Sequence, residues 1–448
     1  MDILAFLQCL RPLLTTTTLR QLSRIAFALL AMTGRVTMLG IARWAGTGGS
    51  YRTVQRFFYT VIPWASVLWQ FFRRHIFRPD DVYILVGDEV VVTKAGRNTY
   101  GLDRFFSGVL QKVVPGVSFF TLSLVSTQER RAFPVQIEQV VRSDEEKAAR
   151  QAQRAAQMAT EPPDRRKPGR PQGSKNQQQP IVLTPELQRI QRRVQEQQRL
   201  MGDLVSLTYL ALDGHFGNHP ALYMTRQCNL HLISKLRSDA ALYFPYQGPY
   251  SGRGPRRKYG DRVNYQNIPD KYLKQTTVEE GVETRIYQAQ LLHKEFSQPL
   301  NVVILVKTNL KTQAWAHVIL FSSDLALPYD KLIEYYSLRF QIEFNFRDAK
   351  QYWGLEDFMN VTATAVTNAA SLSLFMVNLV HVLLRDVRQT DPDLSVLDLK
   401  AYGRGYKYVT ETIKMLPQKP DESLIDQIFR QVAHLGSIHT TEVLTSPS

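Results

Sequence analysis

Apolar and polar residues follow one another in two different rhythms, and the rhythm changes near residue 80. Before this point apolar residues recur every three or four positions, which predicts amphipathic helices at 19–32, 36–45, 51–59 and 65–77. After it, short apolar runs predict buried strands at 83–88, 90–93 and 118–126, followed by a helix from Pro134. The chain is therefore expected to open with a helical bundle and to continue as an α/β unit.

The rest of the chain alternates between polar and apolar stretches. Residues 142–200 contain twelve Gln and many Arg, which predicts two polar helices with a disordered loop between them. The second of these helices would run from Thr184, as its cap, to Leu200, with Pro185 in its first turn. Beyond it, strands are predicted at 207–212, 230–237, 284–291, 300–308 and 314–322, and a helical pattern begins at Leu327.

One segment is long and apolar enough to cross a membrane. Residues 363–384 carry no charge, but they include seven Thr, Ser, Asn or His side chains. Each polar group is costly in lipid, so we expect a buried core helix and no membrane partner. Cys9 and Cys228 are the only cysteines of the sequence, which excludes a disulfide scaffold or a Cys-rich zinc module and fits a reducing cytoplasm.

The net charge of +15 is concentrated in two segments. Residues 1–79 hold ten Arg and one acid, and residues 142–200 hold thirteen basic and seven acidic residues. These excesses account for the whole +15, and a concentrated excess of Arg on a folded module indicates a polyanion such as nucleic acid. The alternative is a solvated basic surface.

Three basic stretches are candidates for DNA contact. The predicted helices at 36–45 and 51–59 are joined by a Gly-rich turn that ends in Ser50, a pattern typical of helix-turn-helix units, although simple bundle packing is the alternative. The Gly-Arg-Pro sequence at 169–171 resembles an AT-hook, whose Arg enters narrow minor grooves, or is only a basic linker. The third stretch is a Pro/Gly-rich loop. The candidate DNA-binding residues are Arg43, Arg52, Gln55, Arg56, Arg165, Arg166, Lys167, Arg170, Lys175, Arg253, Arg256, Arg257 and Lys258.

Two acids end apolar strands, and a third lies in a charged helix. Asp88 and Asp213 follow buried strands, a position at the rim of an α/β sheet where ligands bind, although a turn or cap role is common there too. Glu343 belongs to a group with Tyr336, Arg339 and Lys350, whose spacing places all four on one face of a single predicted helix. An ion pair between Arg339 and Glu343 would account for only two of these four residues on the shared helix face.

Three carboxylates from separate segments can bind two Mg²⁺ ions, which could activate a water or a 3′-hydroxyl and stabilise the leaving oxygen. Mn²⁺ could substitute for Mg²⁺. Arg339 and Lys350 would then hold phosphates, and the Tyr336 hydroxyl would orient one. His215 and His219 raise a zinc alternative, against which the neighbouring glycines and Pro220 argue because they disfavour a helix.

With these residues the chain resembles bacterial insertion-sequence transposases of the DDE type, in the insertion-sequence-four superfamily. That group carries Tyr-x2-Arg-x3-Glu-x6-Lys, and Tyr336, Arg339, Glu343 and Lys350 match it at every position. Asp88 in Val-Gly-Asp-Glu and Asp213 in Leu-Asp-Gly match its first two acids, and Trp-Gly-Leu-Glu at 353–356 also looks familial. The resemblance covers roughly residues 80–385.

The resemblance implies an α/β fold with an RNase H-like catalytic core, interrupted by a β-rich insertion and preceded by a helical DNA-binding domain. It implies catalytic, metal-binding roles for Asp88, Asp213 and Glu343, and DNA cleavage at terminal inverted repeats followed by strand transfer. It also implies double-stranded DNA partners, a homodimer in a synaptic complex and action at the bacterial nucleoid in the cytoplasm. Some relatives stack a flipped base on an insertion-domain Trp; Trp315 lies in the corresponding region, although core packing is the commoner role.

The expected domains follow from these assignments. They are a DNA-binding domain at 1–79, core parts at 80–141, 201–238 and 328–400, a basic insert at 142–200, a β-rich insertion at 239–327 and a C-terminal region at 401–448. Two other functions stay open: a related nuclease that cuts without joining, and a DNA-binding protein without cleavage.

Overall fold

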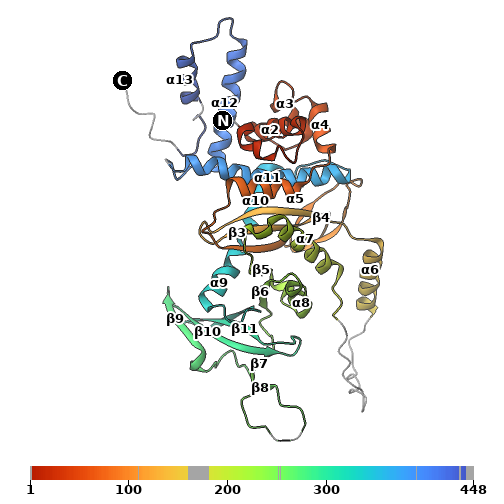
Figure 1. The fold of residues 1–448 in the computed structure, drawn as a ribbon, viewed down its shortest axis with the longest axis vertical. Coiled ribbons are helices and arrows are strands. Elements are labelled where there is room, and N and C mark those ends of the chain that lie inside the picture. The colour runs from red at the N-terminus through yellow and green to blue at the C-terminus, as the bar shows by residue number, and fades with distance from the viewer. Residues whose placement is uncertain are drawn as a thin grey trace.

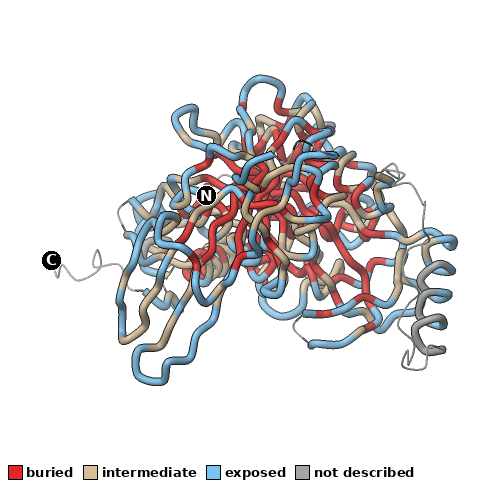
Figure 2. The backbone as a smooth tube through the Cα atoms, turned by 90° about the horizontal axis from the view of Figure 1, so that it is seen from below, coloured by how far each residue is buried: buried red, intermediate tan, exposed pale blue. Residues whose placement is uncertain are grey.

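The computed structural model describes residues 3–108, 110–159, 181–250, 252, 254–389, 391–432 and 435–439. It is a mixed α/β structure in which the described residues form one sheet of twelve strands (Figure 1). Helices from both ends of the chain lie near the top of Figure 1, and the strands β7 to β11 of this sheet, within residues 242–309, lie near the bottom. The buried residues form a continuous band through the middle of the molecule (Figure 2).

The N-terminal helices form where the apolar spacing predicts them. They are α1 (Ile3–Leu7), α2 (Thr16–Ala31), α3 (Met38–Ala45), α4 (Tyr51–Tyr59) and α5 (Trp64–His75). Side chains cap three of them: Thr15 accepts from the N–H of Thr18, Thr37 from Gly40 and Ser50 from Thr53. The predicted helices and the capping role of Ser50 are confirmed.

Five strands make the part of the sheet that carries the first two acids. In spatial order they are β4 (Arg131–Val140), β3 (Lys112–Ser126), β1 (Tyr83–Thr93), β5 (Tyr209–Ala211) and β6 (His231–Leu236). The strands β1, β3 and β4 are antiparallel neighbours, whereas β5 runs parallel to both β1 and β6. The edge strand β2 (Asp103–Ser107) pairs with residues 112–116, the first part of β3.

Two predictions for this region are corrected. The runs at 83–88 and 90–93 belong to one continuous strand, β1. The helix expected from Pro134 is wrong, because residues 131–140 form strand β4. Pro134 is tolerated there because the pairing register of β3 with β4 shifts beside it, between Leu122 and Ser123, and a proline without an N–H suits such a bulge.

The sheet continues from β6 into the β-rich region predicted for 239–327. Strand β12 (Trp315–Ser322) is antiparallel to β6, followed in space by β11 (Leu300–Asn309) and β10 (Val282–His293). Strand β10 also pairs with β9 (Leu273–Glu279) and β7 (Leu242–Pro245), and β7 pairs with β8 (Tyr259–Arg262). The predicted strands of this region are confirmed.

The polar segment between the first two acids folds back onto the sheet. Its helices are α6 (Asp144–Ala159) and α7 (Pro185–Met201), and Thr184 caps α7 with Pro185 in the first turn, as predicted. Arg193 of α7 donates two hydrogen bonds to the Glu138 carboxylate of β4, from Nε and Nη2, each at 2.7 Å. The predicted AT-hook at 165–175 lies outside the described residues.

The remaining helices pack on the sheet, on the N-terminal helices or on one another. They are α8 (His219–Gln227), α9 (Tyr329–Leu338), α10 (Gln341–Trp353), α11 (Ala363–Val387), α12 (Val396–Met415) and α13 (Glu422–Val432). Helices α5, α10 and α11 lie against β4. One helix, Ala363–Arg385, is apolar enough to cross a membrane by length and composition, but its most apolar stretch is 94% buried inside the protein. It is a core helix.

Asn368 ties this core helix to the N-terminal helices. It is buried, and its Oδ1 accepts from Trp64 Nε1 at 2.8 Å. Its Nδ2 donates to the carbonyls of Phe58 at 2.7 Å and Thr60 at 2.8 Å. The end of α4 and the start of α5 are thus fixed to α11 by hydrogen bonds away from water.

Candidate active site

Asp88 and Asp213 lie side by side where the parallel ladder of β1 and β5 ends. Leu85 pairs with Leu210 and Val86 with Ala211 in the parallel ladder of β1 and β5. Continuing this register by two residues brings Asp88 opposite Asp213. Asp213 follows the carboxyl end of β5, whereas Asp88 lies in the middle of β1, which continues to Thr93. Two carboxylates from segments 125 residues apart in sequence therefore meet where α/β sheets bind ligands.

Asp88 is buried enough that its charge is costly. Burial raises the pKa of Asp88 to about 6, against the opposing effect of the Arg339 guanidinium and a hydrogen bond from the Glu89 N–H at 2.7 Å. The negative charges of Asp213 and Glu343 raise the pKa further. The other two predicted acids are thus close enough to Asp88 to disfavour its ionisation, which is the electrostatic character of a cation site.

The third acid reaches this site through Arg339. The Nη1 of Arg339 donates to Asp88 Oδ2 at 3.1 Å, and the Nη2 of Arg339 lies 3.7 Å from Glu343 Oε1. The guanidinium is largely buried, and its Nε makes no hydrogen bond to any described residue. Burial raises the pKa of Glu343, and Arg339 opposes that rise. Arg339 is therefore the bridge between the strand-borne acid and the helix-borne acid.

The single helix predicted for residues 336–350 is wrong, because α9 ends at Leu338 and α10 begins at Gln341. At this joint the hydrogen bonds close shorter rings: Phe340 donates to Ser337, and Glu343 donates to Phe340. Such i→i−3 bonds tighten the turn. The four signature residues are still brought together, but from two helices.

Tyr336 and Lys350 flank the acids. The Arg339 guanidinium lies over the Tyr336 ring, 5.7 Å from its centre. Burial raises the pKa of Tyr336, Arg339 lowers it, and Asp213 raises it again. Lys350 Nζ donates to the carbonyl of Val91 in β1 at 3.2 Å and lies 3.0 Å from Glu356. Lys350 is thus anchored on the strand that carries Asp88.

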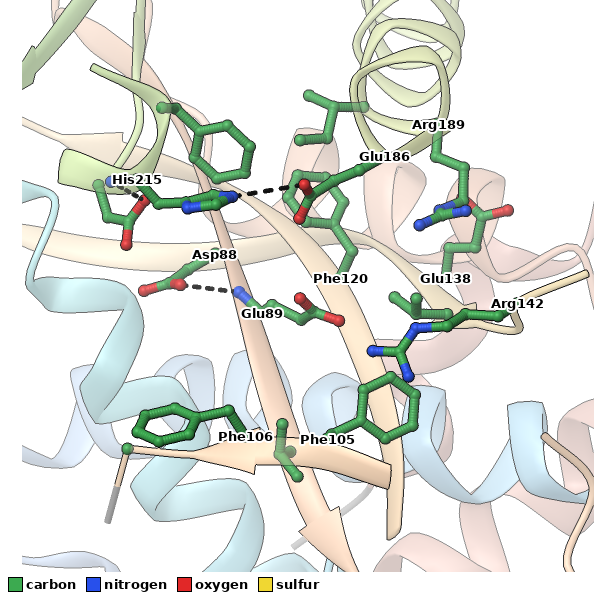
Figure 3. Close-up of a pocket in the computed structure, with 16 residues that line it drawn as sticks. Asp88, Glu89, Phe105, Phe106, Phe120, Glu138, Arg142, Glu186, Arg189 and His215 are labelled. Atoms are coloured by element: carbon green, nitrogen blue, oxygen red, sulfur yellow. Dashed lines mark hydrogen bonds and ion pairs between the residues drawn. The ribbon is translucent and has the colours of Figure 1, made fainter. Parts of the chain in front are cut away.

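A cavity of about 470 Å³ opens beside Asp88 and Asp213 (Figure 3). Its walls combine acids, cations and aromatic rings from β1 to β4, the helix α7 and the turn after Asp213. The lining residues that sequence reasoning missed are Glu89, Phe105, Phe106, Phe120, Glu138, Arg142, Glu186, Arg189 and Phe216. Glu343 and Arg339 do not line this cavity.

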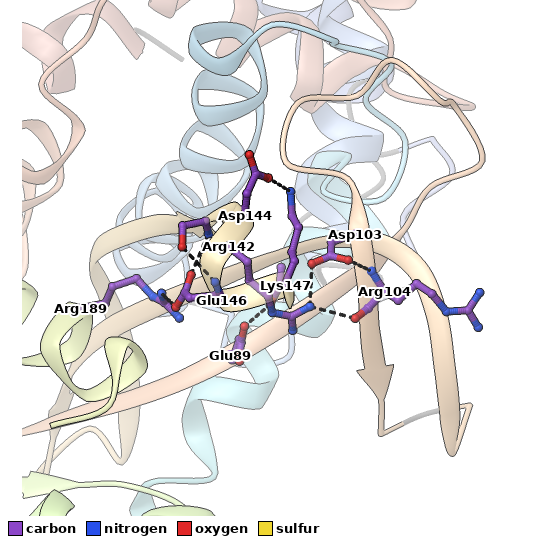
Figure 4. Close-up of polar contacts among 10 residues, drawn as sticks. Glu89, Asp103, Arg104, Arg142, Asp144, Glu146, Lys147 and Arg189 are labelled. Atoms are coloured by element: carbon purple, nitrogen blue, oxygen red, sulfur yellow. Dashed lines mark hydrogen bonds and ion pairs between the residues drawn. The ribbon is translucent and has the colours of Figure 1, made fainter. Parts of the chain in front are cut away.

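The insert supplies one wall of this cavity. Glu186 in the first turn of α7 lies 3.5 Å from His215, which follows Asp213 by two residues. Its neighbour Arg189 binds Glu146 of α6 at 3.0 Å, and Arg142 binds Asp103 of β2 at 2.8 Å (Figure 4). The only signal in the sequence was the Thr184 cap, which places Glu186 in a first turn but says nothing of its partner.

The carboxylates fit a divalent cation in their chemistry. Their oxygens are hard ligands of the kind Mg²⁺ prefers, and a bound cation would remove the penalty that burial and like charges impose on Asp88. In the described part of the chain, however, no three His, Cys, Asp or Glu side chains are already arranged around a metal position. The positive charge of Arg339 stands beside Asp88 and Glu343 instead.

The histidines do not form a zinc pair. His215 lies against Glu186, whereas His219, at the start of α8, has its Nε2 3.3 Å from the hydroxyl of Ser297. The two side chains thus have different partners. The zinc alternative has no support among the described residues.

The candidate DNA-binding residues of the N-terminal helices lie on the surface. Arg43, Arg52 and Arg56 are exposed and Gln55 is half-buried. Arg52 Nη1 donates to Gln55 Oε1 at 3.3 Å, so these two side chains lie on the same face of α4. In the loop before β8, Arg256, Arg257 and Lys258 are exposed, whereas Arg253 lies outside the described residues.

Trp315 stands at the start of β12 with 40% of its surface exposed. Its ring stacks on His317 at 5.2 Å between centres, and His317 stacks on Tyr265 at 4.5 Å. Trp315 is therefore an exposed ring at the end of a stack and not a core residue of the strand.

The site thus combines two carboxylates on neighbouring parallel strands of a mixed sheet, an arginine that contacts a third acid and a polar cavity beside them. The chain belongs to the family described as DDE superfamily endonuclease, which matches residues 6–299. The matched residues include Asp88 and Asp213, and Glu343 lies beyond them.

One solved structure is similar in part: the cryo-EM structure of the piggyBac transposase synaptic complex with hairpin DNA. The likeness has a TM-score of 0.36 at 9% sequence identity and covers 80% of this chain and 59% of that chain. The present chain thus spans less than two thirds of the length of that transposase. No curated protein matches the chain.

Proposed function

We propose that this protein is a DNA transposase of the insertion-sequence-four type, which cleaves at the terminal inverted repeats of an element and joins the ends to target DNA. The observation that carries the proposal is the meeting of Asp88 and Asp213 in the parallel ladder, with Arg339 linking Asp88 to Glu343. The strand order β4-β3-β1-β5-β6, antiparallel and then parallel, supports an RNase H-like core. The signature spacing supports the assignment to this superfamily.

Asp88, Asp213 and Glu343 would hold two Mg²⁺ ions, or Mn²⁺ in their place. Such cations supply activation of a water or a DNA 3′-hydroxyl and stabilise the leaving oxygen. Arg339 contacts Asp88 through Nη1 and Glu343 through Nη2, so its guanidinium would keep one of these contacts while it donates to a phosphate oxygen. Tyr336 would orient the same phosphate, and Lys350, anchored on β1, would hold a neighbouring one.

The basic surfaces would hold the DNA. Arg52, Gln55 and Arg56 on α4 would contact the element end, with Arg43 of α3 on the backbone. The basic segment at 165–175 would add minor-groove contacts. Trp315, exposed at the end of its stack, would receive a flipped base. Synapsis of two ends would need at least a homodimer, acting at the nucleoid in a bacterial cytoplasm. The domains proposed are those expected from the sequence.

The acids are tested by single substitutions in the full chain. Asp88→Asn, Asp213→Asn and Glu343→Gln are assayed for nicking of a duplex that carries an element end, with Mg²⁺. Each should lose cleavage because a metal ligand is lost, while Asp103→Asn, which changes an acid that pairs with Arg142 and does not line the cavity, should keep it. A variant that cleaves as fast as the wild type identifies a residue that is not a ligand.

A second readout separates a transposase from other enzymes with the same site. Labelled element ends are incubated with a target plasmid, and covalent joining is measured. Joining supports the transposase, whereas cleavage without joining indicates a nuclease. Binding of ends with neither reaction, at any divalent metal, would indicate a DNA-binding protein and overturn the proposal.

A further inference from the structure

The β7–β8 hairpin and the segment after it are unusually rich in cations and tyrosines. Residues 250–274 contain seven Lys or Arg and only two acids, and residues 243–272 contain six Tyr. This region lies at the opposite end of the molecule from the N-terminal helices (Figure 1). Its concentration of positive charge is hidden in the whole-chain count, because the surrounding segments balance it.

Many of these cations lie over aromatic rings. The guanidinium of Arg257 lies 4.7 Å from the ring centre of Tyr246, and the ammonium of Lys271 lies 5.0 Å from that of Tyr272. Further along the hairpin the pairs are Arg256 with Tyr250 at 5.5 Å, Lys258 with Tyr259 at 5.7 Å and Lys294 with Tyr243 at 5.2 Å. These contacts restrict the cations, and a ring face accepts no strong hydrogen bond, so it does not use up their N–H donors. Arg257 also donates from Nε to the Tyr259 carbonyl at 2.9 Å, and Lys258 from Nζ to the Ser297 carbonyl at 3.2 Å.

No carboxylate neutralises these cations in the described residues. None of Arg257, Arg262 and Lys271 has a carboxylate oxygen within 4 Å there, and all three are exposed. The cations around the catalytic cavity are different: Arg142 binds Asp103, and Arg193 binds Glu138. The cations of the hairpin can therefore bind a polyanion, whereas the cations at the cavity already form ion pairs within the protein.

A groove of about 440 Å³ lies between the hairpin and the segment at 264–272. Tyr246 and Tyr272 line it together with the cations Arg257, Arg262 and Lys271. Tyr272 stacks on Phe244, with ring centres 4.9 Å apart and an angle of 13° between planes, so that ring is held in a fixed orientation. The groove thus offers two aromatic rings and three cations to one ligand, beside the carboxylate of Asp261, which also lines it and forms no ion pair with these cations.

We propose that this groove binds an unpaired DNA strand, with bases against Tyr246 and Tyr272 and phosphates on Arg257, Arg262 and Lys271. Rings can stack only on base faces that are exposed, and a duplex exposes such faces only at its ends. A site for duplex DNA would need the cations alone. The interleaving of rings and cations is the arrangement that combines backbone tracking with base stacking. The site is separate from the three acids and needs no metal.

The test uses the full chain and three 15-nucleotide probes in a fluorescence anisotropy titration with EDTA. The probes are oligo-dT, an oligonucleotide of the same length without bases, and a duplex. Tyr246→Leu and Tyr272→Leu keep apolar bulk but remove the ring face. Each should weaken oligo-dT binding by at least about fivefold, the lower end of the range for one lost stack, and leave the other two probes unchanged. Tyr223→Leu, at an exposed tyrosine of α8, is the matched control and should change nothing.

Removal of the cations separates charge from stacking. Arg257→Ala with Lys271→Ala should weaken oligo-dT and the probe without bases alike, since both carry the same phosphates. Equal losses for oligo-dT and the probe without bases in the tyrosine variants would overturn the role of stacking. Unchanged oligo-dT binding in all four substitutions would overturn the site. Neither result bears on the proposed transposase, because DNA cleavage by the acids is measured independently.

Discussion

The placement of Asp88 leads to a quantitative expectation: removal of its charge should stabilise the protein while it abolishes cleavage. The pKa of Asp88 rises from 3.8 to about 6 in the fold, mainly because of burial. The folded state therefore keeps this proton to higher pH than the unfolded chain does. The contribution of Asp88 to the free energy of unfolding is largest below about pH 4. It falls between about pH 4 and 6 and stays low above about pH 6. Ionised Asp88 costs at most about 3 kcal/mol at neutral pH.

Solvent and side-chain relaxation reduce that figure, since the side chain keeps 22% of its exposure. Asp88→Asn retains an oxygen for Arg339 but carries no charge. We expect it to be about 1–3 kcal/mol more stable than the wild type at pH 7.5 without metal, and the difference to fall to about half at pH 5. The measurement is urea unfolding of both proteins in EDTA at the two pH values.

An acid with the opposite shift is the control. Burial would raise the pKa of Asp103, but hydrogen bonds from the Arg104 N–H and the Arg142 guanidinium outweigh it and lower the pKa. Asp103→Asn should therefore lose stability at pH 7.5. Addition of Mg²⁺ should raise the unfolding midpoint of the wild type more than that of Asp88→Asn, since a ligand that binds only the native state stabilises it. If Asp88→Asn is no more stable than the wild type at pH 7.5 in EDTA, Arg339 already compensates the buried charge.

Three further outcomes are expected from other parts of the structure. Asn368→Leu leaves the Trp64 N–H and two carbonyls buried without partners, so unfolding should become about 2–4 kcal/mol easier, checked by urea denaturation. Arg339→Gln should lower the single-turnover cleavage rate roughly 10–150-fold, with little change in the affinity for duplex ends, because a charged contact to the phosphate is lost. Gly87→Ala would bring a methyl group within 2.8 Å of Phe120 and 3.0 Å of Leu212, so it should cost about 1–3 kcal/mol and shift Asp88, which a combined stability and cleavage assay would detect.

The sequence was informative where the structure depends on local pattern. Apolar periodicity located the N-terminal helices and most strands, and the apolar run before Asp213 placed that acid at a strand end. The same prediction for Asp88 is wrong, because β1 continues to Thr93 through its pairing with β3. The meeting of the two acids needed one further assumption, that the two strands are parallel neighbours, and the ladder of β1 and β5 satisfies it. Cap chemistry at Ser50 and Thr184 was equally readable, because a hydroxyl and a nearby N–H suffice.

Tertiary packing decided what the sequence could not show. Residues 131–140 contain a proline and alternate weakly, so only their pairing with β3 makes them a strand. The cavity wall formed by Glu186 depends on α7 returning to β4, where Arg193 meets Glu138. The break at Arg339 is also set by packing: Leu338 on one side and Ile342 on the other are both buried, in different helices.

The distribution of charge along the sequence suggested that the basic segments 1–79 and 142–200 bind DNA, while the rest of the chain, with zero net charge, forms the catalytic core. The structure gives that division a different physical form. The N-terminal helices share one hydrophobic core with α11 and β4, and Asn368 fixes the end of α4 to the core helix. The exposed face of α4 is therefore rigidly connected to the sheet that carries Asp88. Deletion of residues 1–79 would expose α11 and destabilise the whole chain, so loss of DNA binding after that deletion would be uninformative. Substitution of Arg52 and Arg56, which are exposed and make no core contact, isolates the contribution of this surface to end binding.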